Sequence, residues 1–96
     1  MKDGANDEFE TFWRTYPSRR PHPNPKKPAH LKFEALVNRG ADPANIIRGA
    51  QNYAAYVAAN VRDPRYITQA LTWLNREQWA EYQEAPDPPR LQVGMN

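Results

Sequence analysis

The sequence contains no cysteine, which excludes a disulfide framework and a zinc site built on thiolates. Its two histidines, His22 and His30, have no suitably spaced carboxylate companion, so we expect neither a metal nor a cofactor. The single serine, Ser18, has no neighbouring base, and no glycine-rich phosphate loop occurs. These absences together predict a protein that is not an enzyme.

Long apolar runs are also missing. No stretch approaches the roughly 20 apolar residues that are needed to cross a bilayer, and the acidic, polar N-terminus is unlike a signal peptide. We therefore expect a cytoplasmic protein with no membrane partner. No segment alternates in polarity as a half-buried strand does. With 96 residues, of which 40% are hydrophobic, the chain has room for one small domain and one small core.

The clearest helical signal runs over residues 43–60. Asp42 is a suitable cap for free backbone N–H groups, and Pro43 fits the first helical position, where its missing N–H is no loss. Apolar residues then recur at helical spacing and predict one broad buried face, made of Ile46, Ile47, Ala50, Tyr53, Ala54, Val57 and Val61. The other segments are expected to cover this face.

Two helices are predicted before this central one. Residues 7–16 carry an aromatic stripe at helical spacing, which we interpret as core: Phe9, Phe12, Trp13 and Tyr16. Residues 28–39 predict a second helix, which starts at Pro28 and ends at Arg39. Gly40 is expected to cap it in a left-handed conformation. The short turn that follows predicts an antiparallel hairpin between this helix and the central one.

After the central helix, residues 67–75 predict a further helix with Ile67, Ala70, Leu71 and Leu74 on one face and Trp73 at its edge. A break near Asn75 would let a short turn at 77–82 bring Trp79 back to the core. The predicted fold is therefore all-α, a small bundle of about four helices. Residues 1–6 and the proline-rich stretch 84–96 are expected to be disordered, which leaves one domain over 7–83.

Charge is distributed unevenly, although the net charge is only +2. Residues 11–39 carry seven basic residues and one acidic residue, a net charge of +6, whereas both ends of the chain are acidic. Within this segment, residues 17–27 form a proline-rich loop that is too polar to be buried. The candidate nucleic-acid-binding residues are Arg19, Arg20, Lys26, Lys27, Lys32, Arg39, Arg48 and Tyr56. A solvated surface with no ligand is the alternative interpretation.

Several short motifs resemble the C-terminal region of phage and prophage replication-initiation proteins, a family of helix-turn-helix replication proteins. They are Phe9-x-x-Phe12-Trp13-x-x-Tyr16-Pro17, Lys27-x-Ala29, Phe33-x-x-Leu36, Ile46-Ile47-x-Gly49-Ala50-x-x-Tyr53 and Thr72-Trp73-Leu74-Asn75-x-x-x-Trp79. This resemblance implies a role in starting DNA replication, through DNA contact or through the host replicative helicase. The chain lacks the winged-helix domain that precedes this region in such proteins.

Two functions are compatible with these observations. The first is a non-catalytic module of phage type that binds nucleic-acid phosphates, the host replication machinery or both. The second is a phage-borne inhibitor or adaptor that docks on a host nucleic-acid machine, such as a helicase or a CRISPR-type defence complex. We expect a monomer or a weak dimer in either case.

Overall fold

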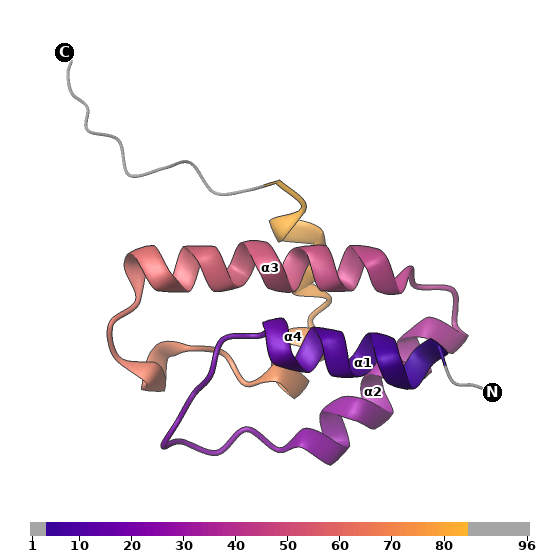
Figure 1. Cartoon of the computed structure of the whole chain (residues 1–96), viewed down its shortest axis with the longest axis horizontal. Coiled ribbons are helices and arrows are strands. Elements are labelled where there is room, and N and C mark those ends of the chain that lie inside the picture. Colours follow the sequence, from indigo (N-terminus) through magenta and orange to yellow (C-terminus); the bar gives the residue numbers. More distant parts are fainter. Residues whose placement is uncertain (1–3, 85–96) are drawn as a thin grey trace, which may run out of the picture.

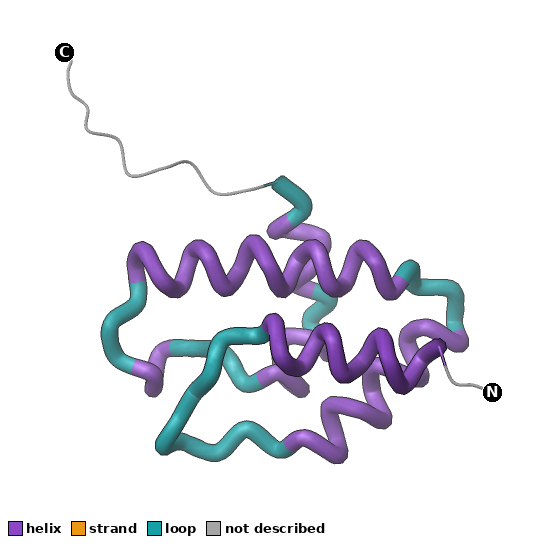
Figure 2. The backbone as a smooth tube through the Cα atoms, in the orientation of Figure 1, coloured by secondary structure: helices purple, strands orange, loops and turns teal. Residues whose placement is uncertain are grey.

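The computed structural model describes residues 4–84, and these residues form helices and connecting loops without any strand (Figure 2). The helices are α1 (Gly4–Thr15), α2 (Lys26–Asn38), α3 (Pro43–Asn60) and α4 (Ala70–Asn75), with two short 3-10 helices, η1 (Pro64–Tyr66) and η2 (Gln78–Tyr82). The prediction of an all-α bundle is confirmed. The disorder predicted for residues 1–3 and 85–96 lies outside the described residues.

Helix α3 runs the length of the molecule, with α1 alongside it and η2 against it (Figure 1). Its start is as predicted: the Asp42 side chain accepts a hydrogen bond of 2.9 Å from the backbone N–H of Ala44, and Pro43 is the first helical residue. The face turned toward α1 and η2 buries Ile46, Ala50, Tyr53 and Val57. No helix within residues 4–84 is long and apolar enough to span a membrane.

The core is built largely from aromatic rings. Phe9, Phe12 and Tyr16 of α1 are buried, as predicted from their spacing. The prediction for Trp73 is wrong, because its side chain is fully buried rather than at the edge of the apolar face of its helix. The short helix α4 places this indole ring 5.8 Å from the ring of Phe12 and 5.4 Å from that of Tyr16 (centroid distances). Trp73 therefore joins α1 to the C-terminal part of the chain.

Three helix starts differ from their predicted positions. Helix α1 starts at Gly4 rather than at residue 7. Helix α2 starts at Lys26 with Pro25 as its N-cap, so Pro28 lies in the first turn, where an N–H has no intrahelical partner. Residues 67–69 precede α4 instead of belonging to it, because η1, capped by Asp63, turns the chain so that Ile67 enters the core.

The predicted hairpin of α2 and α3 is not formed as a packed pair. Gly40 does take a left-handed conformation (φ 108°), and the connection to α3 is short, as predicted. The buried stripe of α2, however, packs against α1 and α4 rather than along α3. The reason is that α1 and η2 already cover the apolar face of α3, so α2 closes the opposite side of the core.

The predicted break after Asn75 is confirmed. Helix α4 ends there, and Glu77 takes a left-handed conformation (φ 52°) that redirects the chain into η2. Trp79 then returns to the core, with its ring centroid 6.3 Å from that of Trp73. Asn52 of α3 holds η2 in place, because its side-chain amide donates a hydrogen bond to the backbone carbonyl of Tyr82.

Candidate functional site

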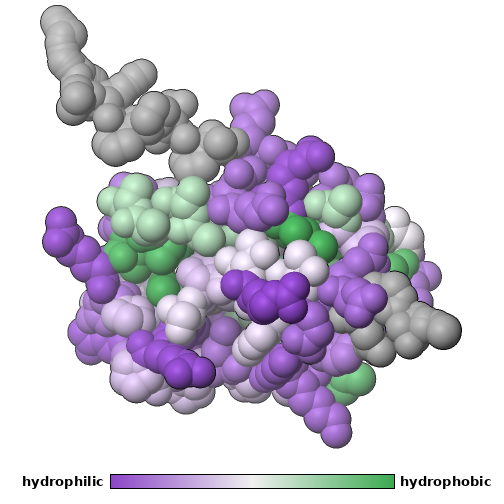
Figure 3. All heavy atoms as spheres, in the orientation of Figure 1, coloured by the Kyte–Doolittle hydropathy of each residue, from purple (hydrophilic) through white to green (hydrophobic). Residues whose placement is uncertain are grey.

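A pocket of about 610 Å³ lies between the C-terminal end of α1 and the proline-rich loop that follows it. All of its lining residues come from one stretch of sequence, residues 13–24. They are Trp13, Arg14, Tyr16, Pro17, Ser18, Arg19, Arg20, His22 and Asn24. None of these is acidic, and three are arginines. The face that carries α1 and this loop is mainly hydrophilic (Figure 3).

The loop that forms the pocket wall is fixed by hydrogen bonds to the segment before α4. The Arg19 guanidinium donates through Nε to the carbonyl oxygen of Ile67 (2.6 Å) and through Nη1 to that of Pro23. The backbone N–H of Ala70 donates to the Asn24 side-chain oxygen (2.9 Å). The proline-rich loop is therefore attached to residues 67–70, while several of its residues remain exposed, as expected from its polarity.

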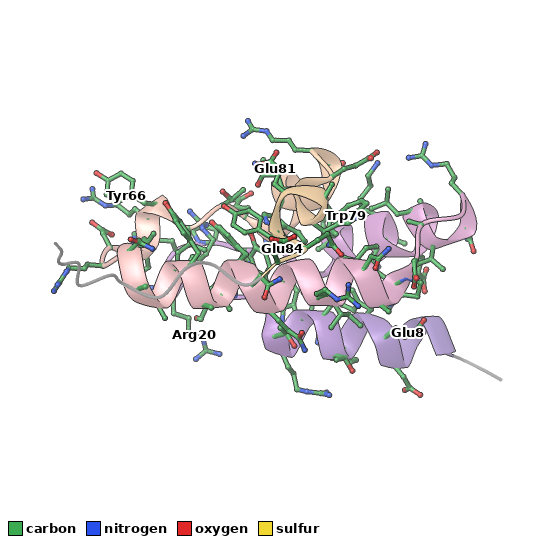
Figure 4. The ribbon with its side chains drawn as sticks, turned by 90° about the horizontal axis from the view of Figure 1, so that it is seen from above. Glu8, Arg20, Tyr66, Trp79, Glu81 and Glu84 are labelled. Carbon is green, nitrogen blue, oxygen red and sulfur yellow. The ribbon has the colours of Figure 1, made fainter. Side chains whose placement is uncertain are left out.

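Arg14 and Arg20 supply accessible positive charge at this pocket. Both side chains are exposed, and neither forms an ion pair with another residue of the part that the structure describes. Arg20 points away from the body of the molecule, on the side opposite to Glu81 (Figure 4). Guanidinium groups bind phosphate and carboxylate oxygens through paired N–H donors, so this arrangement suits an anion.

Trp13 forms an aromatic wall of the same pocket and is half-buried. The ammonium group of Lys26 lies 5.9 Å from the centroid of its ring and 3.2 Å from a carboxylate oxygen of Glu10. Lys26 is thus close to the pocket, although its charge is already paired. The helical spacing predicts a core position for Trp13, and its ring does pack on Phe9 while still bordering the pocket.

The other predicted binding residues lie elsewhere. Arg39 borders a second pocket at the N-terminal end of α3, where Asp42 and Glu77 also lie. Lys27 and Arg48 are exposed on α2 and α3, and Lys32 is half-buried on α2. Tyr56 packs its ring 6.2 Å from that of Tyr82. Of the predicted binding residues, only Arg19 and Arg20 therefore line the first pocket.

Arg14 and Trp13 are among the pocket residues absent from the predicted binding residues, which include only Arg19 and Arg20 of the lining. Both precede Pro17, which ends the first helix, so the chain turns back directly after them. That turn places the last helical residues beside Arg19 and Arg20. Basic residues on both sides of a helix-ending proline were the available signal. No cluster of three residues able to hold a metal ion occurs within residues 4–84.

Tyr16 forms part of the pocket wall and carries a testable pH effect. Its hydroxyl donates to the carbonyl oxygen of Thr68 (2.5 Å), and burial, reinforced by the nearby Tyr53, raises its pKa above the ordinary value of 10.0. The folded protein therefore keeps this proton at a pH where the unfolded chain has lost it. The contribution of Tyr16 to the free energy of unfolding is constant below about pH 10 and falls as the pH rises further.

We expect Tyr16→Phe to lower the free energy of unfolding at pH 8, because the hydrogen bond to Thr68 is lost, and to reduce the further loss between pH 9 and 11. Urea unfolding at several pH values measures both effects. Lysines and the other tyrosines titrate in both proteins, so the difference between the two curves isolates Tyr16. Curves that stay parallel above pH 10 would contradict this assignment.

The comparison with known families corrects the sequence-based assignment. Residues 4–77 match the family described as Legionella vir region protein LvrA C-terminal domain, a match that extends from α1 through α4 and includes every pocket residue. The resemblance to phage replication-initiation proteins is therefore wrong. Most residues of its motifs are buried in the core, so they report the packing of the bundle rather than a function. No curated protein and no solved structure matches the chain. The chain belongs to the LvrA C-terminal domain family.

Proposed function

We propose that this domain is a non-catalytic module that binds nucleic acid through the pocket between α1 and the proline-rich loop. The observation that carries the proposal is the presence of three arginines and no acidic residue among the described residues that line it. A nucleic acid offers closely spaced phosphates along its whole length, and arginine binds them with paired donors.

The placement of charge around the pocket supports this proposal. Arg14 and Arg20 are exposed and line the pocket from two elements, α1 and the loop. Arg19 is held by backbone carbonyls, so its charge adds to the local potential at a fixed position.

We expect Arg14→Ala and Arg20→Ala each to weaken binding of a labelled oligonucleotide by about five- to tenfold, because each removes one phosphate contact. Each substitution should also reduce the slope of log K against log salt by about 1. Fluorescence anisotropy titrations at about 50 and 200 mM salt measure both quantities. Circular dichroism verifies that each variant is folded.

The matched controls are Arg39→Ala and Arg48→Ala, which remove the same charge from exposed positions outside the pocket. They should change the affinity less than twofold. Equal losses in all four variants would show that the domain responds to its net charge rather than to the pocket. An absence of binding by the wild-type protein at low salt would reject the proposal. It would favour the alternative function, docking on a protein component of a nucleic-acid machine.

A further inference from the structure

The shape of the pocket distinguishes between kinds of nucleic acid. Its volume of about 610 Å³ is within the range of pockets that enclose a small molecule, about 300–1,000 Å³. A single phosphate group does not fill such a space. A duplex does not place a base in it, because its bases are paired and stacked inside the helix.

The lining chemistry matches both parts of a nucleotide. Arg14 and Arg20 are cationic and accessible, and Trp13 borders the same pocket with an aromatic ring. The Lys26 ammonium group lies over this ring, so a base that stacks on Trp13 has to displace it. Unpaired bases stack on aromatic side chains, and such stacking is independent of sequence because every base has a π-face. Ser18 and His22 add polar groups that are able to bond the sugar or the edge of a base.

The walls of the pocket are fixed before any ligand arrives. Arg19 joins the loop to Ile67, Asn24 joins it to Ala70, and the Gln69 side chain donates to the carbonyl oxygen of Pro23 (3.5 Å). These bonds attach the loop to residues 67–70, and the hydrogen bond from Tyr16 to Thr68 attaches the end of α1 to the same segment.

We propose that this pocket receives one unpaired nucleotide, with its base against Trp13 and its phosphate between Arg14 and Arg20. The domain then prefers single-stranded nucleic acid over duplex. This inference rests on the proposed function, and it adds the class of ligand and the residue that contacts the base.

The test is a set of anisotropy titrations with the full chain. The probes are labelled single-stranded DNA and RNA 12-mers and a duplex of the same sequence. We expect both single strands to bind at least about tenfold more tightly than the duplex, because only they offer an unstacked base. Unlabelled adenosine monophosphate should displace the labelled strand at lower concentrations than inorganic phosphate does.

Substitutions identify the base-contacting residue. Trp13→Ala should weaken single-strand binding at least about fivefold, whereas Trp13→Phe, which keeps an aromatic ring and the core packing, should retain most of it. The matched control is Tyr66→Ala, since Tyr66 is 72% exposed and lies on η1, outside the pocket. If Trp13→Ala does not fold, the competition by adenosine monophosphate and inorganic phosphate decides the question.

The failure of this inference is distinguishable from the failure of the proposed function. Equal binding of duplex and single strands, with losses in Arg14→Ala and Arg20→Ala, would overturn the nucleotide pocket and leave nucleic-acid binding intact. The nucleotide pocket is likewise overturned if adenosine monophosphate competes no better than phosphate, or if Trp13→Ala behaves like Tyr66→Ala. If no nucleic acid binds at low salt, both proposals fail.

Discussion

Replacing Gly49 by alanine is expected to destabilise the domain by about 2 kcal/mol or more, although alanine is the better helix former. A Cβ atom at this position in α3 would lie 2.5 Å from the Cβ and 2.6 Å from the Cα of Trp79. These distances are far below van der Waals contact, and the Cα belongs to a backbone that cannot rotate away. The η2 segment therefore has to move off α3.

The direction of the stability change in Gly49→Ala distinguishes between helix propensity and the contact with η2. Helix propensity alone predicts that Gly49→Ala stabilises α3 by about 0.5–1 kcal/mol. Loss of the η2 contact predicts a melting temperature lower by about 10 °C or more. Thermal unfolding followed by circular dichroism measures this shift, and tryptophan fluorescence reports whether Trp79 becomes more exposed.

Ala55→Gly is the matched control, because Ala55 lies on an exposed position of the same helix. This variant replaces alanine by glycine at an exposed position and should lower the free energy of unfolding by only about 0.5–1 kcal/mol. A Gly49→Ala variant that is more stable than the wild type would show that η2 does not rest on α3 in solution.

Trp73→Ala is expected to cost about 3–5 kcal/mol, a large share of the roughly 5–15 kcal/mol that stabilises a typical domain. Trp73 is fully buried, and its ring lies within 6.3 Å (between centroids) of the rings of Phe12, Tyr16, Tyr53 and Trp79. Truncation therefore leaves a cavity at the point where α1, α3, α4 and η2 meet. Urea unfolding followed by circular dichroism measures the loss.

Trp73→Phe separates packing from hydrogen bonding. The indole N–H of Trp73 is buried without a hydrogen-bond partner among the described residues. Phenylalanine therefore fills much of the space and sacrifices no hydrogen bond, so it should cost clearly less than alanine. Leu31→Ala is the control for loss of apolar surface, since Leu31 is 59% exposed, and should change the stability by less than about 0.5 kcal/mol. A Trp73→Ala variant as stable as Leu31→Ala would contradict the central position of this ring in the core.

The features predicted correctly from the sequence are those specified by neighbouring residues. Asp42 and Pro43 set the start of α3 through a cap and a fixed φ angle, and both signals act within one turn. Gly40 follows the end of α2 and takes the positive φ angle expected of a glycine cap. The aromatic spacing of α1 identified its buried face because a helix repeats every 3.6 residues.

The features that were missed depend on contacts between distant residues. Trp73 occupies the centre of the core because α1 and α3 leave a space for it, which the local pattern of α4 does not reveal. Helix α2 packs on α1 and α4 because other elements already cover α3. Which basic residues border the same pocket follows from the way the loop packs beside α1, which charge counts do not contain.

The hydrogen bonds from Arg19 to Ile67 and from Ala70 to Asn24 have a consequence for how small a fragment could carry the pocket. A peptide of residues 13–24 would contain every lining side chain of the pocket, yet it would have nothing to brace its loop. The lining is contiguous along the chain but takes its shape from residues 67–70, more than forty positions away. It cannot be transplanted as a linear motif, and under the proposed function a substitution that unfolds α4 should abolish binding without changing any lining residue.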